Sequence, residues 1–268
     1  MIRARNWVLG TMLPPAVFFA LVVLLWQLAT SVWKLPTYLV PTPLEVFEAG
    51  QEHFADLLAA TRLTGAGALA GFALALVFGT ATGLLFAQSR IIERSLYPYA
   101  IFLQTVPIVA IAPVIVMWFG HGFSGVVAVS FILSLFPIIT NATAGLTTID
   151  ANLLELFEVY DAGALAVLWK LRLPNAVGYL VTGAKISCGL SVIGAIVGEI
   201  SAGFGSQSFG LGYVITAATG KLDTAYAFAA ILCSTLLSLA IFTAVTLLGN
   251  WILARWHVSG PRRATVKP

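Results

Sequence analysis

Six long apolar segments with very few charges constrain the fold of this chain more than any other feature. Each segment is long enough to cross about 30 Å of hydrocarbon as a helix. The predicted spans are Leu13–Trp33, Leu63–Ala87, Leu96–Phe119, Val126–Gly145, Val177–Ile200 and Ala225–Leu253. Of the 268 residues, 59% are hydrophobic and 9% are charged, whereas soluble domains carry about a quarter charged residues. The chain is therefore predicted to be an all-α integral membrane protein with six transmembrane helices.

The basic residues are distributed unevenly between the two sides that these spans define. With the N-terminus in the cytoplasm, ten lysines and arginines lie inside, and three, Lys34, Arg62 and Lys221, lie outside. The positive-inside rule requires this bias. Both termini and residues 150–174 are therefore predicted to be cytoplasmic. This placement explains the net charge of +3 without a nucleic-acid partner.

Proline and charge content divide the chain into three predicted parts. Residues 1–62 hold the first span and an extracytoplasmic connector, in which Glu45–Leu58 is predicted to be an amphipathic surface helix. Residues 63–254 form the core of five further spans, and residues 255–268 form a basic cytoplasmic tail.

The 150–174 loop is the largest charged insert in the second half of the chain. Asp150 is placed to cap a helix over Ala151–Tyr160, and Asp161-Ala162-Gly163 is typical of a turn. A second helix then leads to Pro174, which is expected to begin the next span. Short helices with exposed apolar side chains outside the bilayer indicate a surface that binds a partner.

This loop resembles the EAA loop of ABC importer permeases. The family pattern has Glu-Ala-Ala, then a glycine, then Ile-x-Leu-Pro, and the chain matches it at Glu155 and Leu173-Pro174. Leu156-Phe157 replaces the two alanines, Leu171 replaces the isoleucine, and Asp161 replaces the glycine. If that position requires a positive φ, aspartate is tolerated there better than most residue types.

Four further segments resemble permeases for nitrate, sulfonate, taurine and the thiamine pyrimidine precursor. They are Pro107-x2-Ala110-x2-Pro113-x4-Trp118-Phe119-Gly120, Phe136-Pro137-x3-Asn141-x3-Gly145, Val192–Gly203 and Gly210-Leu211-Gly212-Tyr213. The resemblance covers about Leu63–Trp251. It implies a fold like that of type I ABC importer permeases in a bacterial inner membrane.

The resemblance also implies partners. Two identical or homologous permeases would enclose a path across the lipid, dock through their loops on a cytoplasmic ABC ATPase dimer, and receive substrate from an extracytoplasmic binding protein. The residues expected to contact the ATPase are Glu155, Leu156, Phe157, Val159, Tyr160, Asp161, Gly163 and Pro174. No cofactor is expected on this chain. ATP and Mg²⁺ would belong to the ATPase subunit, because this chain has no G-x4-G-K-[S/T] sequence.

Polar side chains and prolines within the spans are the candidates for lining the translocation path. They are Gln104, Pro107, Pro113, Ser130, Asn141, Ser187, Ser191 and Glu199. Each polar side chain is equally compatible with hydrogen bonding between helices. A kink needed only for packing is the alternative for the prolines, and a structural or gating role is the alternative for Glu199.

The glycine-rich fifth span looks closer to permeases for flat nitrogen heterocycles, namely riboflavin or the thiamine pyrimidine precursor. Importers of small anions such as nitrate, sulfonate, taurine and bicarbonate are the alternative. No arginine cluster within the spans favours a tight anion site.

Two other classes of membrane protein fit the sequence less well. An enzyme would need a nucleophile–base pair or a metal site. The histidines are isolated, and Cys188 and Cys233 lie in apolar segments, so neither chemistry is expected. A secondary transporter would need two halves that resemble each other, and no such repeat is present. The chain is therefore predicted to be a non-catalytic transport subunit.

Overall fold

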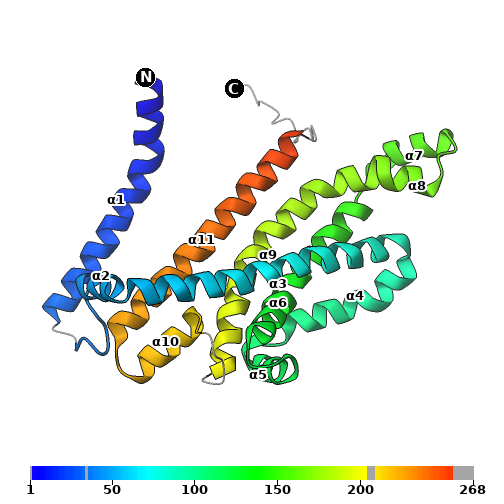
Figure 1. Ribbon diagram of the computed structural model, residues 1–268. Coiled ribbons are helices and arrows are strands. Elements are labelled where there is room, and N and C mark those ends of the chain that lie inside the picture. The colour runs from blue at the N-terminus through cyan, green and yellow to red at the C-terminus, as the bar shows by residue number, and fades with distance from the viewer. Residues whose placement is uncertain (1, 34–35, 204–208, 256–268) are drawn as a thin grey trace.

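The computed structural model describes residues 2–33, 36–203 and 209–255, and all regular structure within these ranges is helical (Figure 1). Five stretches of the described chain are long and apolar enough to cross a membrane. The helices that contain them are α1 (Ile2–Val32), α3 (Phe54–Gln88), α6 (Phe123–Thr147), α9 (Leu173–Ala202) and α11 (Thr224–Arg255). They correspond to five of the six predicted spans.

The third predicted span, Leu96–Phe119, is wrong as a single helix. The chain instead forms α4 (Arg90–Thr105) and α5 (Ile108–Phe119), separated at Val106 and Pro107. Val106 is extended, with φ −71° and ψ 125°, because the proline ring disfavours a helical conformation at the preceding residue. Six membrane-spanning helices are therefore not confirmed. The described chain has five long spans and this broken pair.

The connector between α1 and α3 contains a shorter helix than predicted. α2 runs over Pro43–Glu52 and begins with a reciprocal cap. Thr42 Oγ1 accepts a hydrogen bond from the backbone N–H of Glu45 (3.2 Å), and the Glu45 carboxylate accepts one from the backbone N–H of Thr42 (2.7 Å). α2 ends at His53, and α3 begins directly afterwards at Phe54, well before the predicted start at Leu63.

Helices α3, α6 and α9 form the core, and glycine allows their backbones to approach closely. Ser130 of α6 lies between Gly71 of α3 and Gly194 of α9. A Cβ on Gly71 would lie 2.6 Å from Ser130 Cβ, and one on Gly194 would lie 2.6 Å from Ser130 Cα. Ser130 Oγ donates to the carbonyl of Ser191 at 2.9 Å, so this hydroxyl is satisfied in a dry core. Small residues permit such contacts between helices in lipid.

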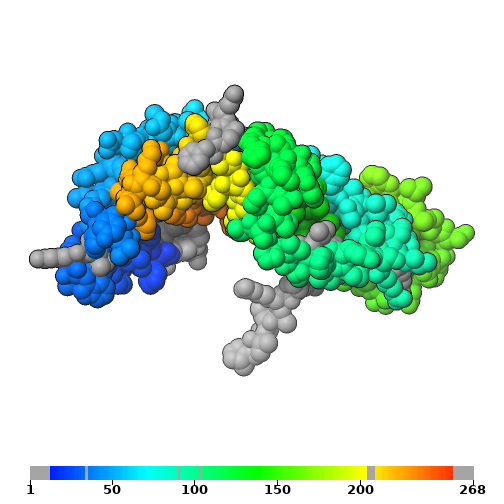
Figure 2. Space-filling view, turned by 90° about the horizontal axis from the view of Figure 1, so that it is seen from below, coloured from blue at the N-terminus to red at the C-terminus, as the bar shows by residue number. Residues whose placement is uncertain are grey.

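The helices place the 150–174 loop, the start of α1 and the end of α11 on one side of the molecule. The start of α1, the end of α11 and the pair α7 (Ala151–Val159) and α8 (Ala164–Val167) lie toward the upper side of Figure 1. α5 and a helix that was not predicted, α10 (Leu211–Gly220), lie at the lower side. Seen from below, the chain is elongated, with α1 and α2 at one end and α4, α7 and α8 at the other (Figure 2).

Candidate functional site

The first helix of the 150–174 loop begins where the sequence predicts. Asp150 Oδ1 accepts a hydrogen bond from the backbone N–H of Asn152 at 2.9 Å, so Asp150 is the N-cap of α7. α7 ends at Val159, one residue before the predicted end. Neither α7 nor α8 contains a buried residue, and Val159 and Tyr160 are 82% and 79% exposed. The apolar side chains at the tip of the loop, Val159 and Tyr160, therefore point away from the core.

The turn after α7 explains the residue that departs most from the EAA pattern. Asp161 has φ 50°, in the left-handed region. Its backbone N–H donates to Glu158 O (2.9 Å), and that of Ala162 donates to Phe157 O (3.0 Å). These two bonds form the Schellman arrangement that closes a helix C-terminus. The expectation that this position can take a positive φ is confirmed, and it gives a physical reason for glycine in the family pattern.

Changing Asp161 should affect this turn according to the left-handed propensity of the new residue. Asp161→Gly is expected to keep the turn, whereas Asp161→Val should destabilise it by about 1–2 kcal/mol, because a β-branched side chain crowds the backbone at positive φ. Hydrogen exchange of the 156–167 peptide measures this. Exchange should accelerate only in the valine variant, and equal exchange in both variants would contradict the explanation.

The second helix of the loop continues into the membrane core. α8, a π-helical turn η1 (Leu168–Arg172) and α9 follow one another without a break, and together they make a helix of 39 residues, Ala164–Ala202. Pro174 lies in the first turn of α9, as predicted, but it does not separate two helices. A proline disrupts the regular i→i−4 pattern, and the π turn changes the hydrogen bonding just before it.

The base of this helix is fixed to the core. Arg172 Nη1 donates to the carbonyl of Ala87 at 3.0 Å, near the C-terminal end of α3, where a cation is favourable. Leu171 beside it is buried. The end of the loop at Arg172 is therefore anchored to α3 and continues into α9, while the tip of the loop at Val159 and Tyr160 is exposed.

The predicted path residues fall into two groups. Gln104 lies on α4, Pro107 lies between α4 and α5, and Pro113 lies on α5. All three are exposed. Ser130, Asn141, Ser187, Ser191 and Glu199 lie on α6 and α9, each with a hydrogen bond inside the chain. Ser187 Oγ, for example, donates to Ser134 O at 2.7 Å. The structure does not bring the two groups together, and their assignment to a path stays a prediction.

Glu199 joins three helices near the end of α9. Its carboxylate accepts from the hydroxyl of Thr64 on α3 (2.8 and 3.0 Å) and from the backbone N–H of Gly212 in the first turn of α10 (2.8 Å). Thr64 Oγ1 in turn accepts from the backbone N–H of Leu211 at 2.9 Å. Glu199 is 6% exposed and Thr64 is 0% exposed. A carboxylate and a hydroxyl from two other helices thus cap the N-terminus of α10, where negative charge is favoured.

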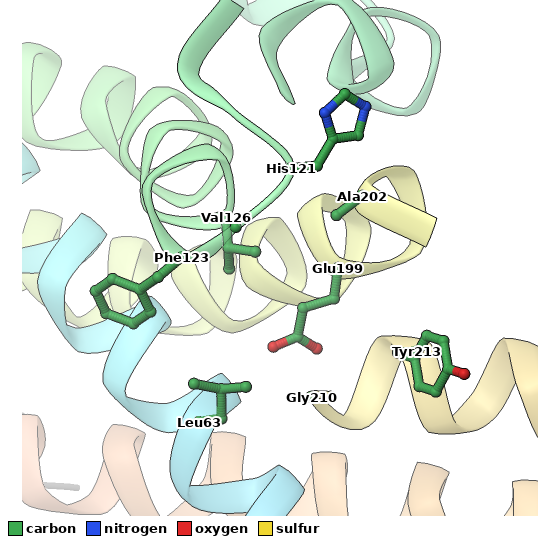
Figure 3. Close-up of a pocket in the computed structure, with 9 residues that line it drawn as sticks. Leu63, His121, Phe123, Val126, Glu199, Ala202, Gly210 and Tyr213 are labelled. Atoms are coloured by element: carbon green, nitrogen blue, oxygen red, sulfur yellow. The ribbon is translucent and has the colours of Figure 1, made fainter. Parts of the chain in front are cut away.

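A small cavity lies beside this junction. Its volume is about 20 Å³, roughly enough for one water molecule. Figure 3 shows the Glu199 carboxylate turned toward Leu63 of α3 and toward Gly210, with His121 at the opposite wall. The cavity is too small to hold an organic substrate within one copy of the chain. Within the described residues, no three histidine, cysteine or acidic side chains could hold a metal ion.

Sequence reasoning missed Thr64 and the N-terminus of α10 as partners of Glu199. A threonine near the start of an apolar span gives no signal of its own. The glycines of the Gly210-Leu211-Gly212 motif were noticed, and the structure explains them. A Cβ on Gly210 would lie 2.0 Å from Glu199 Oε1, and one on Gly212 would lie 2.5 Å from Ile196 O.

Comparison with known proteins agrees with this architecture. Residues 75–257 match the family described as binding-protein-dependent transport system inner membrane component. The chain is 32% identical to the formylaminopyrimidine transport permease protein of Halalkalibacterium halodurans, over 91% of this chain and 96% of that protein. It is 31% identical to the riboflavin transport system permease protein of Chloroflexus aurantiacus, over 89% and 88% respectively.

A third relative is named for a different kind of substrate. It is the putative aliphatic sulfonates transport permease protein of Escherichia coli, which is 31% identical over 88% of this chain and 89% of its own length. The family match covers more than half of the chain, and the relatives are covered almost from end to end. The chain therefore belongs to the ABC transporter permeases of binding-protein-dependent transport systems and is a multi-pass protein of the bacterial inner membrane.

Proposed function

We propose that this chain is the translocation subunit of an ATP-driven importer and that its 150–174 loop docks on a cytoplasmic ABC ATPase. Two permeases, identical or homologous, form the path between them, and an extracytoplasmic binding protein delivers the substrate. ATP and Mg²⁺ bind the ATPase, and this chain contributes no catalytic residue. The observation that carries the proposal is the exposed, apolar and well-capped 150–174 loop.

The loop has the chemistry of a docking surface. Leu156, Val159, Tyr160, Leu165 and Trp169 are all exposed, although each is large and apolar. Aromatic and apolar anchors surrounded by polar groups are typical of protein interfaces. The caps at Asp150 and Asp161 hold α7 in one conformation, which lowers the entropy that binding must overcome.

Two changes in the loop test the docking. Glu155→Lys reverses a charge at the predicted interface, and deletion of Ala162–Gly163 removes the connection between α7 and α8. Both variants are expected to retain little of the ATPase subunit in affinity purification, because docking needs both helices in register. Glu158→Gln is the matched control, since it changes an exposed residue of α7 whose side chain takes no part in the Asp150 cap. Full retention of the ATPase by both variants would refute the docking.

For the substrate, we propose a flat nitrogen heterocycle such as riboflavin or a formylated aminopyrimidine. Two of the relatives reported above are named for such compounds, and the fifth span resembles theirs. In the part of the chain that is described, Lys185 is the only cation well inside a predicted span, and its Nζ donates to Asn250 Oδ1 at 3.3 Å. Several convergent donors would suit a small anion better.

The substrate proposal is tested by ATPase stimulation. The permease is reconstituted with its ATPase and binding protein and is offered riboflavin, formylaminopyrimidine, taurine, nitrate and an alkyl sulfonate in turn. Hydrolysis is expected to rise several-fold with a heterocycle and to stay at the basal rate with the anions. Stimulation by an anion alone would replace the proposal with the anion alternative.

A further inference from the structure

One continuous helix connects the 150–174 loop to the junction at Glu199. The 39 residues of Ala164–Ala202 extend over roughly 55–60 Å at about 1.5 Å per residue. The helix begins in the 150–174 loop, and Glu199 lies less than one turn from its far end. A displacement of the loop therefore reaches the far end without crossing a flexible connection.

At that far end, Glu199 is the polar contact from α9 to the N-terminus of α10. The Gly212 N–H donates directly to the carboxylate, and the Leu211 N–H donates to Thr64 Oγ1. The Thr64 hydroxyl in turn donates to the carboxylate. Because the carboxylate is buried, the loss of either donor would leave an under-satisfied acceptor in the interior, which is costly. A relative movement of α9 and α10 would break these hydrogen bonds in a site of low dielectric constant.

Close steric contacts also restrict movement at the same junction. Gly210 and Gly212 lie so close to Glu199 and to Ile196 O that neither position has room for a methyl group. α10 packs on α3, α9 and α11, whereas the small cavity separates its N-terminus from the turn at His121. α10 is thus held by α11, α9 and α3, with its polar N-terminal attachment on Glu199 and Thr64, and it is attached less tightly to the α5–α6 side.

We propose that Glu199 is a positioning residue that makes α10 follow α9, so that movement of the 150–174 loop is delivered to the opposite end of the permease. The inference rests on the proposed docking of that loop on an ATPase. In this role Glu199 does not bind substrate. It transmits displacement through the capped N-terminus of α10.

Hydrogen exchange of the complex between the permease and its co-purifying ABC ATPase, in lipid nanodiscs, tests both steps separately. Protection of the 150–174 peptide on adding the ATPase subunit reports docking. The change in the 209–220 peptide on adding Mg·ATP reports transmission to α10. The informative variants are Glu199→Gln, Thr64→Val and Gly210→Ala, of which the last crowds the junction without altering the carboxylate or the hydroxyl.

Two of the informative variants, Thr64→Val and Gly210→Ala, have matched controls. Thr64→Ser keeps the hydroxyl, and Gly220→Ala adds a methyl to α10 where nothing lies within 4 Å. In the informative variants, basal exchange at the start of α10 should rise roughly ten-fold, as expected when a buried hydrogen bond is lost. The response of the 209–220 peptide to Mg·ATP should disappear while protection of 150–174 persists. Thr64→Ser and Gly220→Ala should behave as the unsubstituted protein.

A merely structural cap would give a different result. In that case basal exchange would rise but the Mg·ATP response of the 209–220 peptide would remain, and the proposal would be overturned. The same conclusion follows if this peptide does not respond to Mg·ATP in the unsubstituted complex. Absence of protection at 150–174 in the unsubstituted complex would refute the docking itself, and with it the input that Glu199 is proposed to transmit.

Discussion

Gly194→Leu is expected to prevent stable assembly of the α3–α6–α9 core. A Cβ at Gly194 would lie 2.6 Å from Ser130 Cα and 3.1 Å from both Ser130 N and Val129 O. These are backbone atoms, which cannot move aside as a side chain can, and Gly71 of α3 confines the other side of Ser130. Overpacking a tight core costs about 1–3 kcal/mol even where side chains can adjust, so the loss here should be at least about 3 kcal/mol.

The measurement is the yield of monodisperse protein after extraction in detergent, together with its thermal midpoint. Gly189→Leu is the control, because Gly189 is on the same helix and nothing lies within 4 Å of its added Cβ. Both variants insert an equally apolar side chain, so membrane insertion is matched. Similar yield and midpoint for the two variants would show that the close contact at Ser130 is not what holds the core together.

The combined change Val159→Asp and Tyr160→Ala is expected to weaken binding of the ATPase on the order of 100-fold. The two side chains are the most exposed large apolar groups of the loop. Removing a central aromatic anchor typically costs at least about 2 kcal/mol, and a buried aspartate without a partner adds to this. Neither residue contributes to the core, so the permease itself should remain folded.

Titration of the purified ATPase subunit onto permease in nanodiscs measures this affinity. Glu158→Gln is the matched control on α7, since an exposed charge at the rim of an interface contributes little. The double variant should keep the thermal midpoint of the unsubstituted protein. Unchanged ATPase affinity in the double variant would mean that the partner does not use this surface.

Local signals predicted the parts of the fold that depend on local chemistry. The long apolar runs predicted six spans, of which five correspond to long helices, and Asp150 and Asp161 predicted the cap and the turn that enclose α7. Proline could not be interpreted so simply. Pro98 and Pro113 lie inside α4 and α5, while Pro107 separates the two helices, and no local pattern tells these three positions apart.

The junction at Glu199 was beyond local reasoning for a different reason. Its partner Thr64 is 135 positions away in the chain, and α10 was not predicted as a helix. Glu199 itself was recognised, because a carboxylate near the end of an apolar span needs an explanation. Its partners follow only from the packing of α3 against α9, which the sequence of either helix does not reveal.

The π turn η1 also decides in which direction the loop faces. Successive residues of an α-helix are rotated by about 100° around its axis. Gaining or losing one residue in η1 would therefore rotate Leu165 of α8 to another position around the helix axis relative to α9, which packs on α6. The orientation of the exposed loop relative to the membrane helices is therefore set by the geometry of this one turn.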